Sequence, residues 1–218
     1  KIKETAKNIS IPLTVGGGIR SIKDIQDILN AGADKVVINT GAVKDPNFIN
    51  QAVKIFGSST IVVAIETLKD NDENYFVYTD NGREFNNLSA IKWATEIEKR
   101  GAGEILVTSI DKEGTGEGFD IDLLKIISSR VKIPVIAHGG AGNDLHVKEI
   151  FKNSFVDGVA ISSLFHYGSL KKLKRQIISQ NEGNTEFIDQ EKNYKKFFGC
   201  NIQSLKKFLK KNNIKVRI

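Results

Sequence analysis

Two separated segments of this chain carry residue types that bind phosphate. Each joins a pair of glycines to a pair of small polar residues further along the chain: Gly17 and Gly18 with Asn39 and Thr40, and Gly139 and Gly140 with Ser162 and Ser163. Glycines let the backbone come close to an anion, so that its N–H groups point at phosphate oxygens, and the polar side chains add further donors. The pattern predicts two similar anion sites, although glycines that only form tight turns would leave the same pattern.

An acidic side chain lies between these segments, at the end of an uncharged run. Residues 60–65 are mostly apolar, and Glu66 follows them directly. Burial of a carboxylate raises its pKa toward the range that is useful for general acid–base catalysis. Glu66 is therefore a candidate catalytic residue, with a buried structural ion pair as the alternative.

Other titratable side chains follow later strands or lie in helices. Asp111 could orient a loop or take part in catalysis, and His138 could be a neutral hydrogen-bonding residue or a catalytic one. His146 and His166 have no metal-ligand partners at a workable spacing, so we predict no metal site. The chain also has no Walker loop, Rossmann fingerprint or nucleophile elbow, and we predict no cofactor.

The distance between the two glycine segments indicates how the chain must fold to bring them together. Gly18 and Gly140 are 122 positions apart, and Asn39 and Ser162 are 123 positions apart. Each copy reads as a strand, a glycine turn, an amphipathic helix and a second strand. The period exceeds the roughly 20 to 50 residues of solenoid repeats. It is close to half of the about 250 residues of a (β/α)₈ TIM barrel, whose active site lies at the carboxyl ends of the strands.

Six parallel strands are predicted from the apolar runs. They end near Val15, Asn39, Glu66, Ile110, His138 and Ile161. Repeat partners of the strands that end at Glu66 and Ile110 would fall 122 residues earlier, before the first residue of this sequence. We therefore expect an α/β fold, a (β/α)₈ barrel of two half-barrel repeats, with its first two β/α units absent from this chain. Residues 1–8 are then expected to end the second helix.

The remaining segments are expected to belong to the same single domain, residues 1–218. A small hairpin is predicted after Glu66, with residues 75–78 and 83–85 as its strands and Asp80, Asn81 and Gly82 as its turn. Residues 169–218 depart from the repeat. They are expected to form a variant C-terminal tail, with a polar loop over 180–193 and a final helix over 204–211.

Composition indicates which partners to expect and in which compartment the protein works. The net charge is +6, and much of the excess lies within residues 171–175 and 206–211, where a solvated helix face explains it. No recognition module or row of stacking aromatics accompanies these basic residues, so we do not expect a nucleic-acid partner. No apolar run approaches the roughly 18 residues of a membrane span. The single Cys200 fits a reducing compartment, and we expect a cytoplasmic protein.

Several motifs in combination resemble the cyclase subunit of imidazole glycerol phosphate synthase, the HisF family. The resemblance covers about residues 1–167. It is carried by residues 14–19 (TVGGGI), 33–35 (ADK), 38–40 (INT), 100–106 (RGAGEIL), 108–111 (TSID) and 139–142 (GGAG). Each motif alone is less specific, because the sister isomerase of histidine synthesis shares the half-barrel plan.

The resemblance implies a lyase of histidine biosynthesis that works as a heterodimer. Family members take ammonia from a glutaminase subunit, HisH, and pass it through the barrel. The ammonia reacts with an aminoimidazole carboxamide nucleotide that carries two phosphates. The products are imidazole glycerol phosphate and an aminoimidazole carboxamide ribotide.

The resemblance also implies roles for individual residues. One phosphate site is formed around the first glycine turn by Gly17, Gly18, Asn39 and Thr40. The other is formed by Glu113, Gly114, Gly139, Gly140, Ser162 and Ser163. Glu66 and Asp111 remain the candidate catalytic carboxylates, Asp111 because of its position at the end of a strand and not because of the resemblance. Lys35 and Glu104 resemble two members of a charged gate where ammonia enters at the opposite end of the barrel.

Three positions depart from the family pattern. The family uses two aspartates as general acid and base, one on the first strand, which this chain lacks, and one where this chain has Glu66. The added methylene moves the carboxylate by about 1 Å or more, and such a misplacement can cost roughly a hundredfold in rate. Glu113 stands where Asp is usual, and His138 stands where a small polar residue is usual.

These departures leave other functions open beside the cyclase. One is a HisF-like subunit that delivers ammonia for sugar amidation in surface polysaccharide synthesis. A second is a sugar-phosphate isomerase on the same half-barrel plan, and a third is a fragment that only binds ligand. Because two strands and one carboxylate are expected to be absent, we predict that the 218-residue chain alone is inactive.

Overall fold

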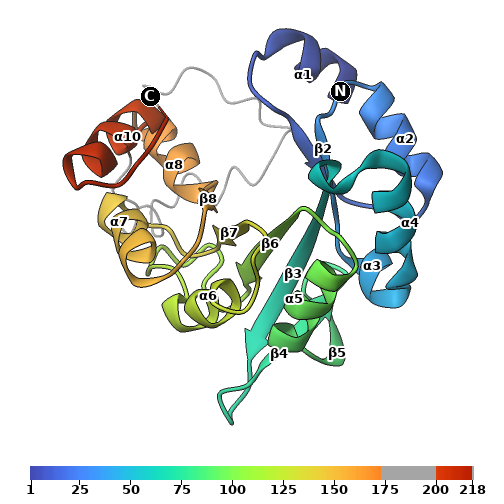
Figure 1. The fold of residues 1–218 in the computed structure, drawn as a ribbon. Coiled ribbons are helices and arrows are strands. Elements are labelled where there is room, and N and C mark those ends of the chain that lie inside the picture. Colours follow the sequence, from blue (N-terminus) through green and yellow to red (C-terminus); the bar gives the residue numbers. More distant parts are fainter. Residues whose placement is uncertain (173–199, 218) are drawn as a thin grey trace, which may run out of the picture.

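The computed structural model describes residues 1–172 and 200–217. Its central feature is a curled sheet of six parallel strands in the order β1, β2, β3, β6, β7 and β8. These strands are Thr14–Gly16, Lys35–Ile38, Ile61–Lys69, Glu104–Ser109, Val135–His138 and Gly158–Ala160. Helices cover the convex side of the sheet (Figure 1). Within the described residues, β1 and β8 are the two ends of the strand path. The α/β fold with parallel strands is therefore confirmed.

Helices alternate with these strands along the chain. They are α1 (Ile2–Asn8), α2 (Ile22–Asn30), α3 (Thr40–Lys44), α4 (Asn47–Phe56), the short 3₁₀ helix η1 (Ser58–Thr60), α5 (Ala90–Lys99), α6 (Ile121–Ser128), α7 (Asp144–Asn153), α8 (Ser163–Lys172) and α10 (Ile202–Lys211). Side-chain caps begin several of them. Helix α2 begins with a capping box, in which the Ser21 hydroxyl accepts from the Asp24 N–H and the Asp24 carboxylate accepts from the Ser21 N–H.

The two sequence repeats adopt the same order of elements. In the first, β1 leads through the glycine turn to α2, and β2 then leads into α3, which begins at Thr40. In the second, β7 leads through the glycine turn to α7, and β8 is followed by α8, which begins at Ser163. The second polar residue of each pair therefore starts a helix in both copies.

Successive side chains along each strand point to opposite faces of the sheet. One face packs against the helices, and the other faces the interior of the curled sheet. In β2, Val36 and Ile38 are fully buried against the helices, whereas Lys35 and Val37 on the opposite face are half-buried. The core between sheet and helices is made of large aliphatic side chains such as Ile25, Ile49, Ile97, Leu124 and Ile150. This packing fixes which residues of each strand point inward.

The inserted hairpin corrects the predicted length of β3. The apolar run predicted a strand ending at Glu66, but β3 continues to Lys69. Residues beyond Glu66 stay in the strand because β4 (Tyr75–Thr79) pairs with them antiparallel, Glu66 opposite Tyr78 and Lys69 opposite Tyr75. Strand β5 (Glu84–Ser89) completes the hairpin. The turn residues Asp80, Asn81 and Gly82 all have positive φ angles, of 52°, 59° and 75°.

The C-terminal segment matches the prediction in part. The final helix α10 begins at Ile202, two residues earlier than expected, buries Leu205 and Leu209, and packs against α7. Helix α8 was not expected, and the predicted loop over 180–193 lies outside the described residues. Lys207, Lys210 and Lys211 are exposed on α10, as a solvated basic face requires. Among the helices that the structure describes, none combines the length and the apolar character needed to span a membrane.

Candidate functional site

A cavity lies at the carboxyl ends of the strands. Its volume is about 1180 Å³. Its walls come from the glycine turn after β1, the end of β2, inward-facing residues of β3 and β6, and the hairpin turn. A smaller cavity of about 210 Å³ lies beside the glycine turn after β7. Glu113 and His138 line both cavities, so the two spaces adjoin.

The first glycine turn lines the large cavity and is open to solvent. Gly17 and Gly18 have φ angles of 102° and 71°, which only glycine adopts readily. A Cβ at either position would meet no atom within 4 Å. Asn39 and Thr40 lie beside this turn and line the same cavity. The Asn39 Oδ1 atom is buried and accepts no hydrogen bond from any residue that the structure describes.

The second glycine turn lines the small cavity and is buried. Gly139 and Gly140 have φ angles of 94° and 101°. A Cβ at Gly140 would overlap the carbonyl oxygen of Gly118, whose own N–H donates to the Gly140 carbonyl at 2.8 Å. Ser162 and Ser163 complete the wall of this cavity from the end of β8. Glu113 and Gly114, on the loop between β6 and α6, line the same cavity.

Glu66 projects from the middle of the sheet into the large cavity. Burial raises the pKa of its carboxyl group, and the negative charge of Glu113 adds to the shift. Hydrogen bonds from the Asn39 side chain and the Gly82 backbone N–H act in the opposite direction, as does His138. Within residues 1–172 and 200–217, no Lys or Arg forms an ion pair with Glu66. This favours the functional alternative for Glu66 over a structural ion pair.

His138 is tied to its neighbouring strand. Its Nδ1 atom lies 3.0 Å from the Thr108 hydroxyl, which is 6% exposed. The side chain thus has a fixed hydrogen-bonding partner at the boundary of the two cavities. This geometry favours the hydrogen-bonding alternative for His138 over the catalytic one.

Comparison with known proteins agrees with this geometry. The family described as "Histidine biosynthesis protein" matches residues 1–171 of this chain. The imidazole glycerol phosphate synthase subunit HisF of Methanococcus vannielii is 44% identical, and the match covers 83% of this chain and 74% of the relative. The chain belongs to the HisF family. The HisF subunit of Hydrogenobaculum sp. is 44% identical, covering 99% of this chain and 74% of the relative. That of Bacillus cereus is 46% identical, covering 83% and 72%.

The residues that resemble the gate of the HisF family are joined at the amino-terminal ends of the strands. Lys35 and Glu104 are the first residues of β2 and β6, the strands on either side of β3. The Lys35 ammonium and the Glu104 carboxylate lie 2.6 Å apart, and both side chains are largely buried. Val37, Ala64 and Leu106, which lie further along β2, β3 and β6, line the large cavity.

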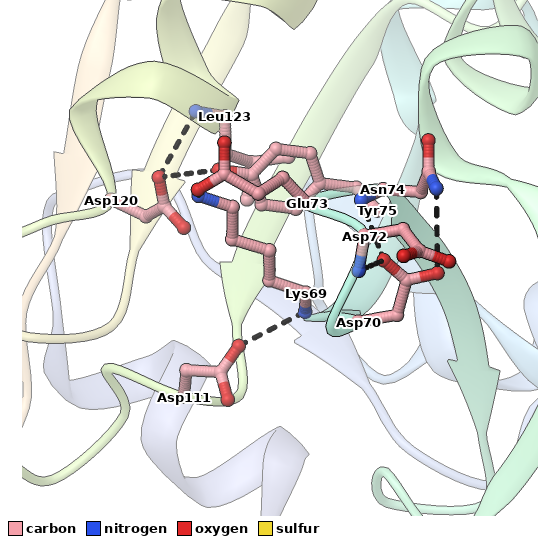
Figure 2. A network of polar contacts seen from close by, with 9 residues as sticks. All are labelled: Lys69, Asp70, Asp72, Glu73, Asn74, Tyr75, Asp111, Asp120 and Leu123. Carbon is pink, nitrogen blue, oxygen red and sulfur yellow. Dashed lines mark hydrogen bonds and ion pairs between the residues drawn. The ribbon is translucent and has the colours of Figure 1, made fainter.

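Asp111 does not line either cavity. Its carboxylate accepts a hydrogen bond of 3.0 Å from the Lys69 N–H and so ties the start of the β6–α6 loop to the end of β3 (Figure 2). In the same region the Tyr75 hydroxyl donates to Asp120 at 3.1 Å, and Asp120 also caps α6 by accepting from the Leu123 N–H. This position favours loop orientation, of the two roles that the sequence left open for Asp111.

Several cavity residues were missed by reasoning from the sequence. Arg20 and Lys44 bring positive charge to the rim of the large cavity near the first glycine turn. The hairpin turn of residues 80–82 also lines it. The Asp-Asn-Gly pattern predicted this turn, but only the pairing of β4 with β3 brings it over the end of β2. In the part of the chain that the structure describes, no group of three or more His, Cys, Asp or Glu side chains is arranged to hold a metal ion.

Proposed function

We propose that this protein is the cyclase subunit of imidazole glycerol phosphate synthase. In this reaction ammonia and a bis-phosphorylated aminoimidazole carboxamide nucleotide give imidazole glycerol phosphate for histidine biosynthesis. The main support is that two glycine turns border adjoining cavities, with Glu66 between them. That arrangement suits a substrate with a phosphate at each end and its reacting atoms in the middle.

Each end of the substrate is assigned a set of donors. At the first turn, the backbone of Gly17 and Gly18 and the side chains of Asn39 and Thr40 bind one phosphate. At the second turn, Gly139, Gly140, Ser162 and Ser163 bind the other, with Gly114 across the small cavity. Arg20 and Lys44 line the large cavity together with the carboxylates of Asp45, Glu66, Asp80, Glu84 and Glu113, so phosphate binding is assigned to the donors of the turn rather than to the net charge of the cavity.

Glu66 is assigned the proton transfers of ring formation. A general acid or base works best when its pKa lies near the working pH, and burial raises the pKa of Glu66 in that direction. Asp111 is assigned a positioning role, through its contact with the Lys69 N–H.

Ammonia is assigned a route along the barrel interior. The Lys35–Glu104 pair lies at the amino-terminal ends of the strands, where a HisH-like glutaminase subunit would dock and release ammonia. The apolar residues Val37, Ala64 and Leu106 lead from there to Glu66. We also propose that the six-stranded sheet belongs to a single-domain (β/α)₈ barrel, because its parallel strands form a curled sheet with helices on its convex side.

The test is to supply the full-length protein with ammonium salt and the bis-phosphorylated nucleotide. Formation of imidazole glycerol phosphate by mass spectrometry, abolished in Glu66→Gln, is expected. No product above background from folded protein would reject the proposal.

A second function is favoured by one residue, Glu66, which stands where the HisF resemblance implies Asp. A subunit that delivers ammonia for sugar amidation could tolerate the longer side chain, because ring closure would not be required of it. Glu66→Asp distinguishes the two functions. A rise in cyclase turnover by this variant, from a low starting value, favours ammonia delivery, whereas high turnover in both forms favours the cyclase.

A further inference from the structure

The turn of the inserted hairpin forms a wall of the large cavity that the proposed function leaves without a role. Asp80, Asn81 and Gly82 all line this cavity, and all three have positive φ angles. A run of three such residues is an uncommon backbone conformation, since side chains other than glycine and asparagine or aspartate rarely adopt it. Positive φ angles are typical of tight hairpin turns, and the cavity lining shows that this turn lies at the cavity.

One backbone group of this turn holds a phosphate-binding residue. The Asp80 N–H donates a hydrogen bond of 3.2 Å to the Thr40 hydroxyl oxygen. A hydroxyl has one proton to donate and two lone pairs that accept. With a lone pair occupied by Asp80, the hydroxyl proton of Thr40 is directed away from the hairpin, where an anion in the cavity can accept it.

The other end of the turn lies at Glu66. Glu66 pairs with Tyr78 in the hairpin and lines the same cavity as Gly82, whose backbone N–H lowers the pKa of the Glu66 carboxyl group. Gly82 also packs closely on the β6 side, where a Cβ would come within 3.1 Å of the Ile110 Cδ1 atom. The turn therefore spans from the first phosphate site to the carboxylate between the two sites.

A set of hydrogen bonds at the base holds this turn in place. The Arg83 N–H donates to the Thr79 carbonyl at 3.0 Å. The Thr79 side chain is 1% exposed, donates to the Glu84 carboxylate at 3.2 Å and accepts from the Asn86 amide at 3.0 Å. Lys44, from α3, lies 3.8 Å from the same carboxylate. These contacts make the turn a rigid support, which positioning requires.

We propose that residues 80–82 are a positioning element, which orients the Thr40 hydroxyl as a phosphate donor and fixes the Glu66 carboxylate over the substrate. This inference rests on the proposed function of the site. The hairpin turn itself is not assigned any bond-making role.

The test compares two substitutions of Asn81. Asn81→Gly keeps the positive φ angle available, whereas Asn81→Val makes it unfavourable because a β-branched side chain rarely adopts it. Phosphate affinity at each turn is measured from the amide NMR shifts of Gly18 and Gly140 during titration with inorganic phosphate. The ionisation of Glu66 is followed by NMR in protein labelled with ¹³C-glutamate, its signal assigned with Glu66→Gln.

Asn81→Val is expected to weaken phosphate binding about tenfold at Gly18 and to leave binding at Gly140 unchanged. Loss of the Gly82 hydrogen bond is expected to raise the titration midpoint of Glu66 further. Asn81→Gly is expected to leave both measurements within about twofold of the parent. The factor of ten corresponds to loss of one hydrogen bond to a charged group.

Equal losses in Asn81→Gly and Asn81→Val would overturn the proposal, because the Asn81 side chain rather than the turn would then be responsible. Unchanged values in a folded Asn81→Val protein would overturn it as well. If that variant does not fold, Thr79→Val replaces it, since this change removes the brace while keeping the strand. Phosphate binding and the Glu66 titration need no turnover, so a protein without cyclase activity rejects the proposed function and leaves this test valid.

Discussion

The two glycine turns share a sequence pattern but differ in their surroundings. The first, at Gly17 and Gly18, is exposed, and a side chain at either position would point into open space. The second, at Gly139 and Gly140, is buried against the loop between β6 and α6. Gly142 continues this contact, because a Cβ there would overlap the Gly116 carbonyl.

The two turns need glycine for different physical reasons. At the first turn, glycine is needed for backbone conformation and for access by a ligand. At the second, it is needed also for packing, since the Gly118 N–H bonds to the Gly140 carbonyl and leaves no room for a side chain. The same substitution should therefore have unequal effects at the two turns.

The largest difference is expected for Gly140→Ala. The positive φ angle and the overlap with the Gly118 carbonyl add together, so we expect a loss of about 3 kcal/mol or more in the free energy of unfolding. Urea denaturation followed by circular dichroism measures it. A loss under about 1 kcal/mol would show that the loop moves freely away, and the distinction between the turns would disappear.

Glu66→Gln tests whether the two turns serve one substrate. Turnover should fall about a hundredfold or more, because a positioned acid or base contributes at least that much. Phosphate binding at Gly18 and at Gly140 should not weaken, since neither turn is altered. A variant that loses phosphate affinity at both turns would instead make Glu66 part of the binding site.

The same variant carries a prediction about pH and stability. Burial raises the pKa of Glu66 in the folded protein, so the folded state binds more protons than the unfolded state just above the ordinary Glu pKa. The parent therefore loses stability as the pH rises through this window, and Glu66→Gln does not. The stability of Glu66→Gln relative to the parent should increase between about pH 4 and about pH 7. A constant difference across this range contradicts the buried state of the carboxyl group.

Gly18→Ala should cost less than Gly140→Ala. Only the φ angle of 71° is unfavourable, so about 1–2 kcal/mol of unfolding free energy is expected to be lost. The melting temperatures of the two alanine variants, measured side by side, give the comparison directly. An equal loss in both would mean that the first turn is packed in a way that its open surroundings do not indicate.

The smallest expected effects come from the polar partners of the turns. Thr40→Val and Ser162→Ala should each weaken phosphate binding by about tenfold, the first at Gly18 and the second at Gly140. Isothermal titration calorimetry with inorganic phosphate, combined with the NMR shifts of the two glycine amides, separates the sites. Weaker phosphate binding at Gly140 in Thr40→Val, or at Gly18 in Ser162→Ala, would contradict the assignment of these polar residues to the two sites.

Local patterns in the sequence were enough for most of the elements. The capping residues Ser21 and Asp24, the Asp-Asn-Gly turn and the apolar stripe of α10 act through neighbours a few residues away, so they could be predicted. Helix α8 was missed because residues 163–172 have no clear apolar face. The extension of β3 to Lys69 was missed because β4, a separate strand, supplies its hydrogen bonds.

For the candidate site, too, some features could be predicted from the sequence and others could not. The repeat spacing placed both glycine turns and Glu66 at one end of a barrel, since parallel strands bring their carboxyl ends to the same edge. It did not show that the Asp80 N–H reaches Thr40, or that Asp111 turns away from the cavities to accept from the Lys69 N–H. Those contacts join residues 40 and 42 positions apart.

The repeat, the order of strands and helices, and the residue types that meet at the carboxyl ends could all be predicted from the sequence. Hydrophobic periodicity and turn chemistry are local, so no tertiary contact is needed to recognise them. The folded structure was needed to show that one glycine turn is open and the other is packed, and that a hairpin supports Thr40 and Glu66. These outcomes depend on contacts between distant segments, whose distances and burial are set only when the sheet curls and its helices pack.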